Sequence, residues 1–568
     1  MKASLSRDMG RRLLKVSLAI VVIAFSFFLI KNLKSFAQVD KPVSTTVTIG
    51  NAAPVFTAGP IENPTSSTST PTPSGNQITF QATATDANGQ PYFLTVCSTD
   101  SITPKEGVAG AGDCATDKEY CKSAAAVASG TQNSCAYTTG SQDAFSNPWF
   151  AFVCDNDATD SACSPAGQGT GDSGSPFVVN HVPTFTAISN NSPKEPGETV
   201  TWTATASDVD AGSTIKLLVC KSAGITAAGA CTGDSWCEST AVASNPTCGY
   251  NIPSVEADGN NNAWVYVVDQ YNTPATGVAQ GTQSNFTVSN VRPTVTAVSI
   301  NGGLAINLTE STTTSVPITA TVTDKNGCST SEITTVTAYA YRSDLSSTCT
   351  ADGALDGNEC YKATCIQDVG SCSAGNGSAT YTCTASFQYY ADATDANTPN
   401  AALGWAATVY ANDENTTAPL PFASSPEVEL NSLIAFTVTP SINYGTLGIG
   451  ESNDPLDKIL TTTPTGNTSL SQSHHGTQMC IDSPTCSGGT PIAAAQQRYG
   501  LTGVAYASGT TLKTSIEASG LHIPKVNNGT VTTKNTYWGI SIPAGILPGA
   551  YTGQNTITGN KASLSDWL

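Results

Sequence analysis

Carboxylate and amide side chains recur at matching places along this chain of 568 residues. Three alternating stretches each end on an Asp that is followed two residues later by Asn or Asp, and three Trp-containing stretches each end on another Asp. Such oxygen ligands suit Ca²⁺, and the loops at one end of a β-sandwich can bring them together. The same pattern is an ordinary turn signal, because an Asp carboxylate accepts backbone N–H groups two residues on. Both interpretations stay open for Asp86, Asn88, Asp155, Asp208, Asp210, Asp269, Asp324, Asn326 and Asp413.

A serine motif is the strongest sign of catalysis in the sequence. Residues 171–176 read Gly-Asp-Ser-Gly-Ser-Pro, which is similar to the nucleophile motif of chymotrypsin-like proteases. That chemistry needs a His general base and then an Asp before the Ser, and the first His of the chain is His181. The motif therefore predicts a turn before a strand, and we expect no catalytic residues.

Histidine and cysteine gather once, near the C-terminus. His474, His475, Cys480 and Cys486 could be ligands of a metal ion, with His522 as a further donor. Adjacent residues on a strand point in opposite directions, and two cysteines six residues apart in an oxidising compartment favour a disulfide. The sequence therefore favours a disulfide loop over a metal site here.

Cysteine is the most regular of the reactive residue types. All 18 cysteines follow residue 37, with six, four, six and two in four successive segments. Even counts in an exported chain indicate disulfides within each segment, whereas zinc sites favour close pairs that repeat. The first two segments share four aligned cysteines, so the two extra ones, Cys154 and Cys163, are expected to pair with each other. The most local solution gives Cys97–Cys114, Cys121–Cys135, Cys154–Cys163, Cys220–Cys231, Cys237–Cys248 and Cys480–Cys486.

The third cysteine-containing segment departs from this pattern. Tyr339 and Tyr341 stand where its first strand cysteine should be, so Cys328 is expected to replace that residue and to pair with Cys349. The pairing of the other four stays open. They are Cys360, Cys365, Cys372 and Cys383.

Three repeats must position these side chains. The residues two, four, six and eight places before Asp86, Asp208 and Asp324 are all apolar, with mainly Thr between them. This period of two predicts a strand with one buried face. Pro183 and Pro293, each ending an Asn-x-x-Pro joint, open the second and third repeats. The expected domains are three sandwich repeats at 51–180, 181–290 and 291–440, and a distinct C-terminal β domain at 441–568.

Composition agrees with an all-β chain. Thr, Val, Ala, Gly and Pro are abundant, only 12% of residues are charged, and β-branched residues suit pleated sheets. The formal net charge is −19, and residues 38–568 hold 17 Lys and Arg against 42 Asp and Glu. Such a surface repels phosphate backbones, so nucleic-acid binding is excluded.

The N-terminus carries an export signal. Basic residues precede a 15-residue apolar run at 16–30, and Ser35 and Ala37 are small residues placed for cleavage before Gln38. Leu13 and Leu14 could lengthen the run toward the roughly 20 residues that span a bilayer. Residues 1–37 are thus either a cleaved signal peptide or a membrane-anchoring helix, and both place the rest of the chain outside the cell. Residues 38–50 are expected to be a linker.

These features resemble a known class of surface protein. The segments 83–89, 205–210 and 323–327, the Trp-to-Asp strands and the Asn-x-x-Pro joints are similar to tandem immunoglobulin-like domains of bacteria, including cadherin-like and PKD-like types. They resemble in particular the exported proteins of this kind predicted in candidate-phyla bacteria. The resemblance implies a role at the cell surface and names no ligand. We expect other cell-surface proteins or glycans as partners.

Two functions are compatible with the sequence. The main expectation is a non-enzymatic structural or adhesion protein whose repeats act as spacers and binding modules. The alternative is a secreted carbohydrate-binding or polysaccharide-degrading protein, because Trp and Tyr platforms bind sugars and 43 acidic residues allow carboxylate pairs.

Peptide mapping under non-reducing conditions tests the cysteine analysis. In protein made in an oxidising compartment, we expect Cys154 linked to Cys163 and Cys480 linked to Cys486, because each pair is the most local one available. Free thiols at these four positions would contradict export to such a compartment.

Overall fold

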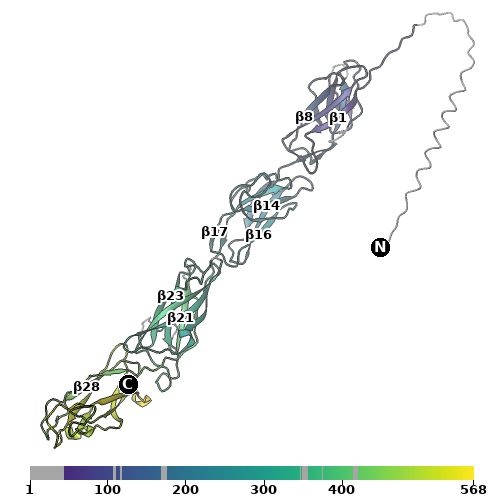
Figure 1. Cartoon of the computed structure of the whole chain (residues 1–568). Coiled ribbons are helices and arrows are strands. Elements are labelled where there is room, and N and C mark those ends of the chain that lie inside the picture. The colour runs from purple at the N-terminus through teal and green to yellow at the C-terminus, as the bar shows by residue number, and fades with distance from the viewer. Residues whose placement is uncertain are drawn as a thin grey trace, which may run out of the picture. The chain divides into compact units, whose positions relative to one another are not determined.

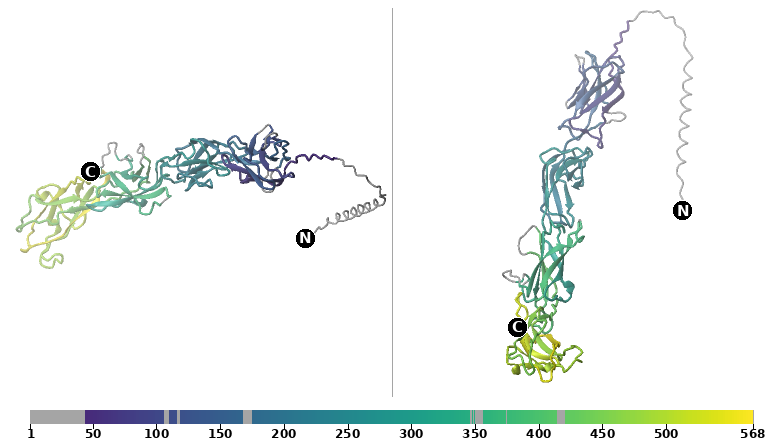
Figure 2. Two further views of the ribbon diagram at one scale, coloured as in Figure 1. Left: turned by 90° about the horizontal axis from the view of Figure 1, so that it is seen from above. Right: turned by 60° about the vertical axis from the view of Figure 1, so that its left-hand side comes forward.

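The computed structural model describes the chain as an all-β protein. It covers residues 44–105, 110–115, 118–167, 175–345, 347, 349, 356–373, 375–413 and 420–567. Figure 1 and Figure 2 show strands throughout this part, and its only helices are four single 3₁₀ turns. No helix in these ranges is long and apolar enough to cross a membrane. The export segment expected at 1–37 and most of the serine motif lie outside the described residues.

The described chain forms two compact units. The first comprises the chain up to Thr65 with Thr79–Tyr137 and Pro148–Ser175, and the second comprises Ser66–Ile78, Thr138–Asn147 and Pro176–Leu568. The all-β expectation is confirmed in both.

The first unit contains two antiparallel sheets and a short hairpin. Alternation of buried and exposed residues along its central strand puts Phe80 in the core, where its ring lies 5.0 Å from that of Trp149. Tyr92 is also fully buried, and its hydroxyl accepts the N–H of Ala84. The sheet orders are β1 (Val55–Asn63), β3 (Gln77–Thr85), β8 (Gln132–Thr138), and β10 (Phe150–Asp155), β4 (Tyr92–Cys97), β7 (Glu119–Lys122), with the hairpin β5 (Ile102–Thr103), β6 (Asp113–Cys114).

The second unit opens with a small sheet and a complete sandwich. Within the sandwich, β13 pairs with β12 and β16, and β14 pairs with β15 and β18, which is a strand order of the immunoglobulin-like type. Trp202 and Phe286 meet edge to face at 5.5 Å in the shared core. The sheets are β2 (Thr72–Pro73), β11 (Phe177–Asn180), β9 (Ser146–Asn147); β12 (Thr184–Asn190), β13 (Thr199–Ser207), β16 (Thr247–Asn251); β15 (Ser235–Glu238), β14 (Ile215–Cys220), β18 (Trp264–Asp269); and β17 (Gly259–Asn261), β19 (Phe286–Val288).

The third repeat is one continuous seven-stranded sheet. Its two halves join because β23 (Cys360–Gln367) pairs with strands on both sides, and the first strand lies against the last two, so the sheet folds over a single core. Trp405 is fully buried in that core. The other strands, in sheet order, are β20 (Thr294–Ile300), β21 (Thr313–Thr323), β24 (Ser378–Gln388), then β22 (Thr335–Arg342), β25 (Trp405–Asn412) and β26 (Phe422–Ser424).

The C-terminal domain pairs a five-stranded sheet with a three-stranded one. His474 lies in its core, with its ring 4.6 Å from Tyr499 and 5.3 Å from Trp538. Burial lowers the pKa of His474 to about 4, which is the behaviour of a neutral core residue. The sheets are β27 (Phe436–Val438), β28 (Lys458–Pro464), β33 (Lys534–Ile540), β30 (Gln497–Gly500), β31 (Thr510–Thr511), and β32 (Glu517–Ile523), β29 (Leu470–Gly476), β34 (Asn555–Lys561).

All 18 cysteines are paired. The six local pairs expected from the sequence are the pairs in the structure. The expectation for the third repeat, Cys328 with Cys349, is wrong, because the structure joins Cys349 to Cys360 across 11 residues and Cys328 to Cys372 across 44. The remaining pair, Cys365–Cys383, links residues that face each other on β23 and β24.

Candidate functional site at the repeat joints

The first Asp of each predicted pair caps a turn. In all three repeats, its Oδ1 accepts the backbone N–H two residues on, which fixes the chain as it leaves the second strand. The N···O pairs are Asn88 to Asp86 (2.7 Å), Asp210 to Asp208 (2.9 Å) and Asn326 to Asp324 (2.7 Å).

The second residue of each pair holds the joint that precedes its repeat. Each Asn-x-x-Pro joint presents one backbone N–H directly after its Asn, and the Asn or Asp side chain accepts that N–H. The pairs are Ala52 to Asn88 (2.8 Å), His181 to Asp210 (2.7 Å) and Val291 to Asn326 (2.6 Å). The recurring motif is therefore a latch between the incoming chain and the turn, and we call it the joint latch.

The Asn of two joints reaches the Asp that ends the Trp strand. Asn51 Nδ2 donates to Asp155 Oδ2 at 2.5 Å, and Asn180 Nδ2 donates to Asp269 Oδ2 at 2.7 Å. Asp155 is 0% exposed and Asp269 is 1% exposed, so the acceptor of each hydrogen bond is buried. Asp413 is likewise buried directly after β25. Asp155 and Asp269 thus provide a second contact that holds their joints.

The latch differs between repeats because Asn and Asp offer different atoms. Asn326 has an amide donor, which bonds to the carbonyl oxygens of Glu256 at 3.1 Å and Ser289 at 3.0 Å. Asp210 has no donor, and its second oxygen instead shares a 2.6 Å hydrogen bond with Nδ1 of His181. In both cases the side chain is satisfied by groups of the joint or of the preceding repeat.

Two of the turn aspartates, Asp324 and Asp208, have raised pKa values. Asp324 is 1% exposed, and its Oδ2 has no hydrogen-bond partner among the described residues. Burial raises the pKa of Asp324 to about 6, with smaller contributions from the negative charges of Asp413 and Asp258. Burial also raises the pKa of Asp208 in the second repeat. These carboxyl groups carry a cost when they ionise in the folded state.

The carboxylates do not assemble into a metal site within the described ranges. No group of three or more His, Cys, Asp or Glu side chains there is placed to hold a metal ion. The oxygens that the sequence analysis offered to Ca²⁺ mostly accept backbone N–H groups. Calcium binding at Asp86, Asp208 and Asp324 stays a prediction.

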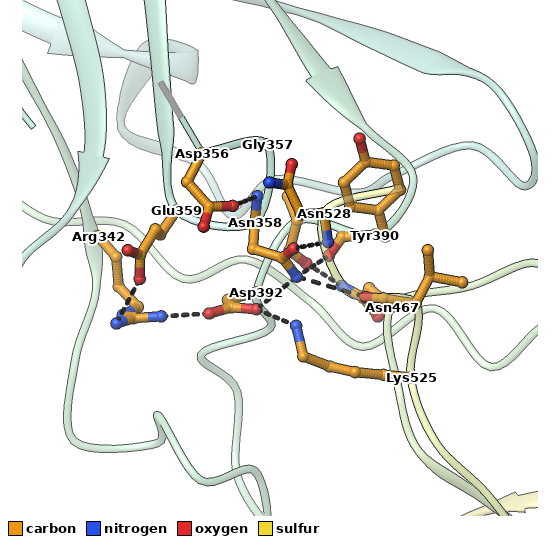
Figure 3. Close-up of polar contacts among 12 residues, drawn as sticks. Arg342, Asp356, Gly357, Asn358, Glu359, Tyr390, Asp392, Asn467, Lys525 and Asn528 are labelled. Carbon is orange, nitrogen blue, oxygen red and sulfur yellow. Dashed lines mark hydrogen bonds and ion pairs between the residues drawn. The ribbon is translucent and has the colours of Figure 1, made fainter. Parts of the chain in front are cut away.

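A second polar cluster joins the third repeat to the C-terminal domain (Figure 3). The buried carboxylate of Asp392 pairs with Arg342 Nη1 from β22 and with Lys525 Nζ from the C-terminal domain. Arg342 also pairs with Glu359 at 2.8 Å. A buried charge needs such partners, because desolvation of an unpaired carboxylate costs several kcal/mol.

Two asparagines complete this cluster from buried positions. Asn358 Nδ2 donates to the carbonyl oxygen of Tyr390 at 3.1 Å, and its Oδ1 accepts the N–H of Asn528. Asn467 is 0% exposed and donates to the carbonyl oxygen of Ala391 at 3.0 Å. Backbone groups of the two domains are thus tied through side-chain amides.

The sequence analysis predicted the turn contacts of Asp86, Asp208 and Asp324 as one of two interpretations. It did not predict that Asn88, Asp210 and Asn326 hold the joints. The Asn-x-x-Pro joints were visible, and the recurrence of Asn beside Asp was the available signal for the contact between them. The Asp392 cluster was missed because it occurs once, so no repeat could reveal it. Four of the seven tryptophans are fully buried and so are not sugar-binding platforms at the surface; they are Trp149, Trp202, Trp405 and Trp538.

Comparisons with known proteins add little to this description. No family model matches the chain, and no curated protein matches it. Among solved structures, a marsupial T cell receptor is 9% identical, with a TM-score of 0.25 over 66% of this chain and 99% of that one. An ICAM-5 D1–D4 ectodomain fragment is also 9% identical, with a TM-score of 0.22 over 88% and 98%. TM-scores this low do not establish a shared arrangement, so the fold rests on the sheets themselves.

The pKa of Asp324 predicts a pH-dependent stability difference. Its folded pKa of about 6 lies above the unfolded value, so its destabilising effect is absent below about pH 4, grows between pH 4 and 6, and is complete above that. Asp324→Asn keeps the Oδ1 acceptor and removes the charge. We expect the variant to gain roughly 1 to 3 kcal/mol over the native chain at pH 7 and little at pH 4. Thermal melts across this range check the trend.

The matched control is Asp234→Asn, whose side chain is 85% exposed. It should not change the pH profile. An Asp324→Asn profile parallel to that of the native chain would show that Asp324 ionises normally.

Calcium binding has a separate test. Because the turn aspartates already accept backbone N–H groups, we expect the same melting temperature in millimolar Ca²⁺ and in chelator. A higher melting temperature in Ca²⁺ that Asp208→Asn reduces would instead establish these turns as ion sites, because a ligand that binds only the folded state stabilises it.

Proposed function

We propose that this chain is an exported, non-enzymatic surface protein whose sandwich repeats act as a spacer and present the C-terminal domain. The joint latch is the observation that carries this proposal. A flexible linker would need no buried contacts, whereas here a backbone N–H group of each joint is held by the first turn of the repeat that follows.

The contacts at the third joint support a fixed geometry between neighbours. Asn326 bonds both to Val291 of the joint and to the carbonyl oxygen of Glu256 in the preceding repeat. The Glu256 N–H donates to the carbonyl oxygen of Lys325 at 3.0 Å. Two hydrogen bonds of the buried Asn326 side chain and one between backbone groups limit rotation about this joint.

The disulfide bonds support an extracellular location. Nine disulfides spread along the chain from Cys97 to Cys486 are typical of proteins that fold in an oxidising compartment. Acidic repeats with few basic residues suit a hydrated surface protein. An adhesive role for the C-terminal domain, toward other surface proteins or glycans, completes the proposal.

Electron microscopy of single negatively stained molecules tests the spacer role. In the full chain, purified in detergent, we expect a narrow distribution of angles between the second and third repeats. Asn326→Ala should broaden it, because the partly buried Val291 N–H loses its acceptor at a cost of about 1 kcal/mol.

Lys325→Ala is the matched control at the neighbouring position. The Lys325 ammonium lies 3.5 Å from Glu195, both side chains are more than half exposed, and such pairs contribute little. It should leave the distribution unchanged. A broad distribution in the native chain would refute the spacer, and polysaccharide turnover in a glycosidase screen would favour the carbohydrate-active alternative.

A further inference from the structure

His181 is buried in the second joint, where its backbone N–H group and both of its ring nitrogens face oxygen atoms. The side chain of His181 is 8% exposed and that of Asp210 is 1% exposed. The backbone N–H of His181 donates to Asp210 Oδ2 at 2.7 Å, and the ring Nδ1 lies 2.6 Å from Asp210 Oδ1. The other ring nitrogen, Nε2, lies 3.3 Å from the carbonyl oxygen of Gly140. The ring therefore lies between two acceptors.

This arrangement fits one protonation state of the ring. A carboxylate and a carbonyl oxygen accept hydrogen bonds and do not donate them, and a neutral imidazole has a single N–H group. If the bare nitrogen were Nδ1, its lone pair would face the Asp210 carboxylate, and if it were Nε2, its lone pair would face the Gly140 carbonyl oxygen. The imidazolium ion has an N–H group on each nitrogen and forms both hydrogen bonds.

The charges around His181 favour the same protonation state. Four carboxylates lie on the segments around the ring, and no Lys or Arg occurs within three residues of any of them in the sequence; they are Asp143, Asp208, Asp210 and Asp269. Burial raises the pKa of Asp208, and the negative charges of Asp210 and Asp269 raise it further. Asp210 pairs with one basic side chain among the described residues, that of His181. A positive charge on the ring offsets the repulsion among these carboxylates.

The other two joints have no ionisable side chain at the equivalent positions. Ala52 and Val291 donate the same backbone N–H group, and the acceptors there are the side chains of Asn88 and Asn326. The second joint differs from both at two positions at once, because it combines a His with an Asp. A His side chain gains or loses its charge near neutral pH, whereas Ala, Val and Asn do not titrate.

We propose that His181 makes the second joint sensitive to pH. The protonated ring ties the turn at Gly140 to the turn at Asp210, and loss of one proton from the ring breaks the contact with Gly140. The remaining ring proton stays on Nδ1, because the contact with the carboxylate is the shorter and stronger one. The Gly140 carbonyl oxygen also accepts the N–H of Asp143 at 3.1 Å, so it keeps a partner when the ring leaves. This inference concerns one joint and does not depend on the spacer role proposed above.

The direction of the pH effect follows from the proton that the joint binds. The folded joint binds the ring proton more tightly than the unfolded chain does, because only the fold supplies an acceptor for each nitrogen. The stabilisation is therefore present in full below about pH 6.5, where an unfolded His also takes a proton, and is lost as the pH rises above that value. The effect of Asp324 is complete above about pH 6, so the two effects occupy different pH ranges.

Nitrogen NMR of the full chain, labelled with ¹⁵N only in its histidines, tests the protonation state directly. The chain has four histidines, and the signal that disappears in His181→Val belongs to His181. At about pH 7, in detergent with a chelator, we expect a proton on both ring nitrogens of His181 and the loss of one at higher pH. His474, with its pKa of about 4, is the internal control and should be neutral. A neutral His181 ring at pH 7 would overturn the proposal.

Hydrogen exchange measured by mass spectrometry tests the effect on the joint in the same full chain. The exchange rate of peptides that cover residues 180–183 is divided by that of peptides that cover residues 290–293, so that the chemical dependence of exchange on pH cancels. We expect this ratio to rise by up to about tenfold per pH unit above about pH 6.5, because each opening of the second joint then releases a proton.

Two variants separate this effect from a loss of folding. His181→Val removes the titrating ring but leaves the Asp210 carboxylate without its cation. The double variant His181→Val/Asp210→Asn gives the second joint the Val and Asn that form the third joint of the native chain. We expect the exchange ratio to be independent of pH in both variants. A native ratio that stays flat, or a rise of equal size in the double variant, would overturn the proposal.

Discussion

A backbone N–H group that enters a folded domain must find an acceptor, and this requirement organises the chain. Directly after the Asn of each Asn-x-x-Pro joint, one N–H lies where the incoming chain meets a repeat. The Pro that ends the joint has no N–H group and restricts the residue before it to extended conformations. The acceptor for the N–H group after the Asn is therefore not a neighbouring strand but a side chain of the turn. The Asx turn that presents this acceptor in turn depends on the Asp two residues earlier.

The same residues explain the electrostatic character of the repeats. A carboxylate that must lie at a buried turn cannot be fully solvated, and Asp324, with its raised pKa, shows that cost. At the boundary with the C-terminal domain, ion pairs of Asp392 with Arg342 and Lys525 offset the desolvation cost of the buried carboxylate. The turn aspartates recur in every repeat and contribute to the negative charge of the repeats. The C-terminal domain, which supplies Lys525, has no net charge.

The predictable features of the structure were the ones that recur. Alternation before Asp86, Asp208 and Asp324 predicted the central strands, and the missing cysteine pair of the second repeat predicted Cys154–Cys163. Cys328 was misassigned because its partner, Cys372, lies 44 residues away between β23 and β24, and this bridge has no counterpart in the first two repeats. Partners of single buried groups, such as Lys525 for Asp392, depend on how two domains meet, and no periodicity in the sequence encodes that.

The joint latch also bears on how such a chain changes during evolution. Its donor is a main-chain group, and Ala52, His181 and Val291 each supply it although their side chains differ. A gene segment that encodes one joint and one sandwich carries both halves of the latch with it. Duplication or recombination of that segment would therefore lengthen the protein without compensating substitutions in its neighbours.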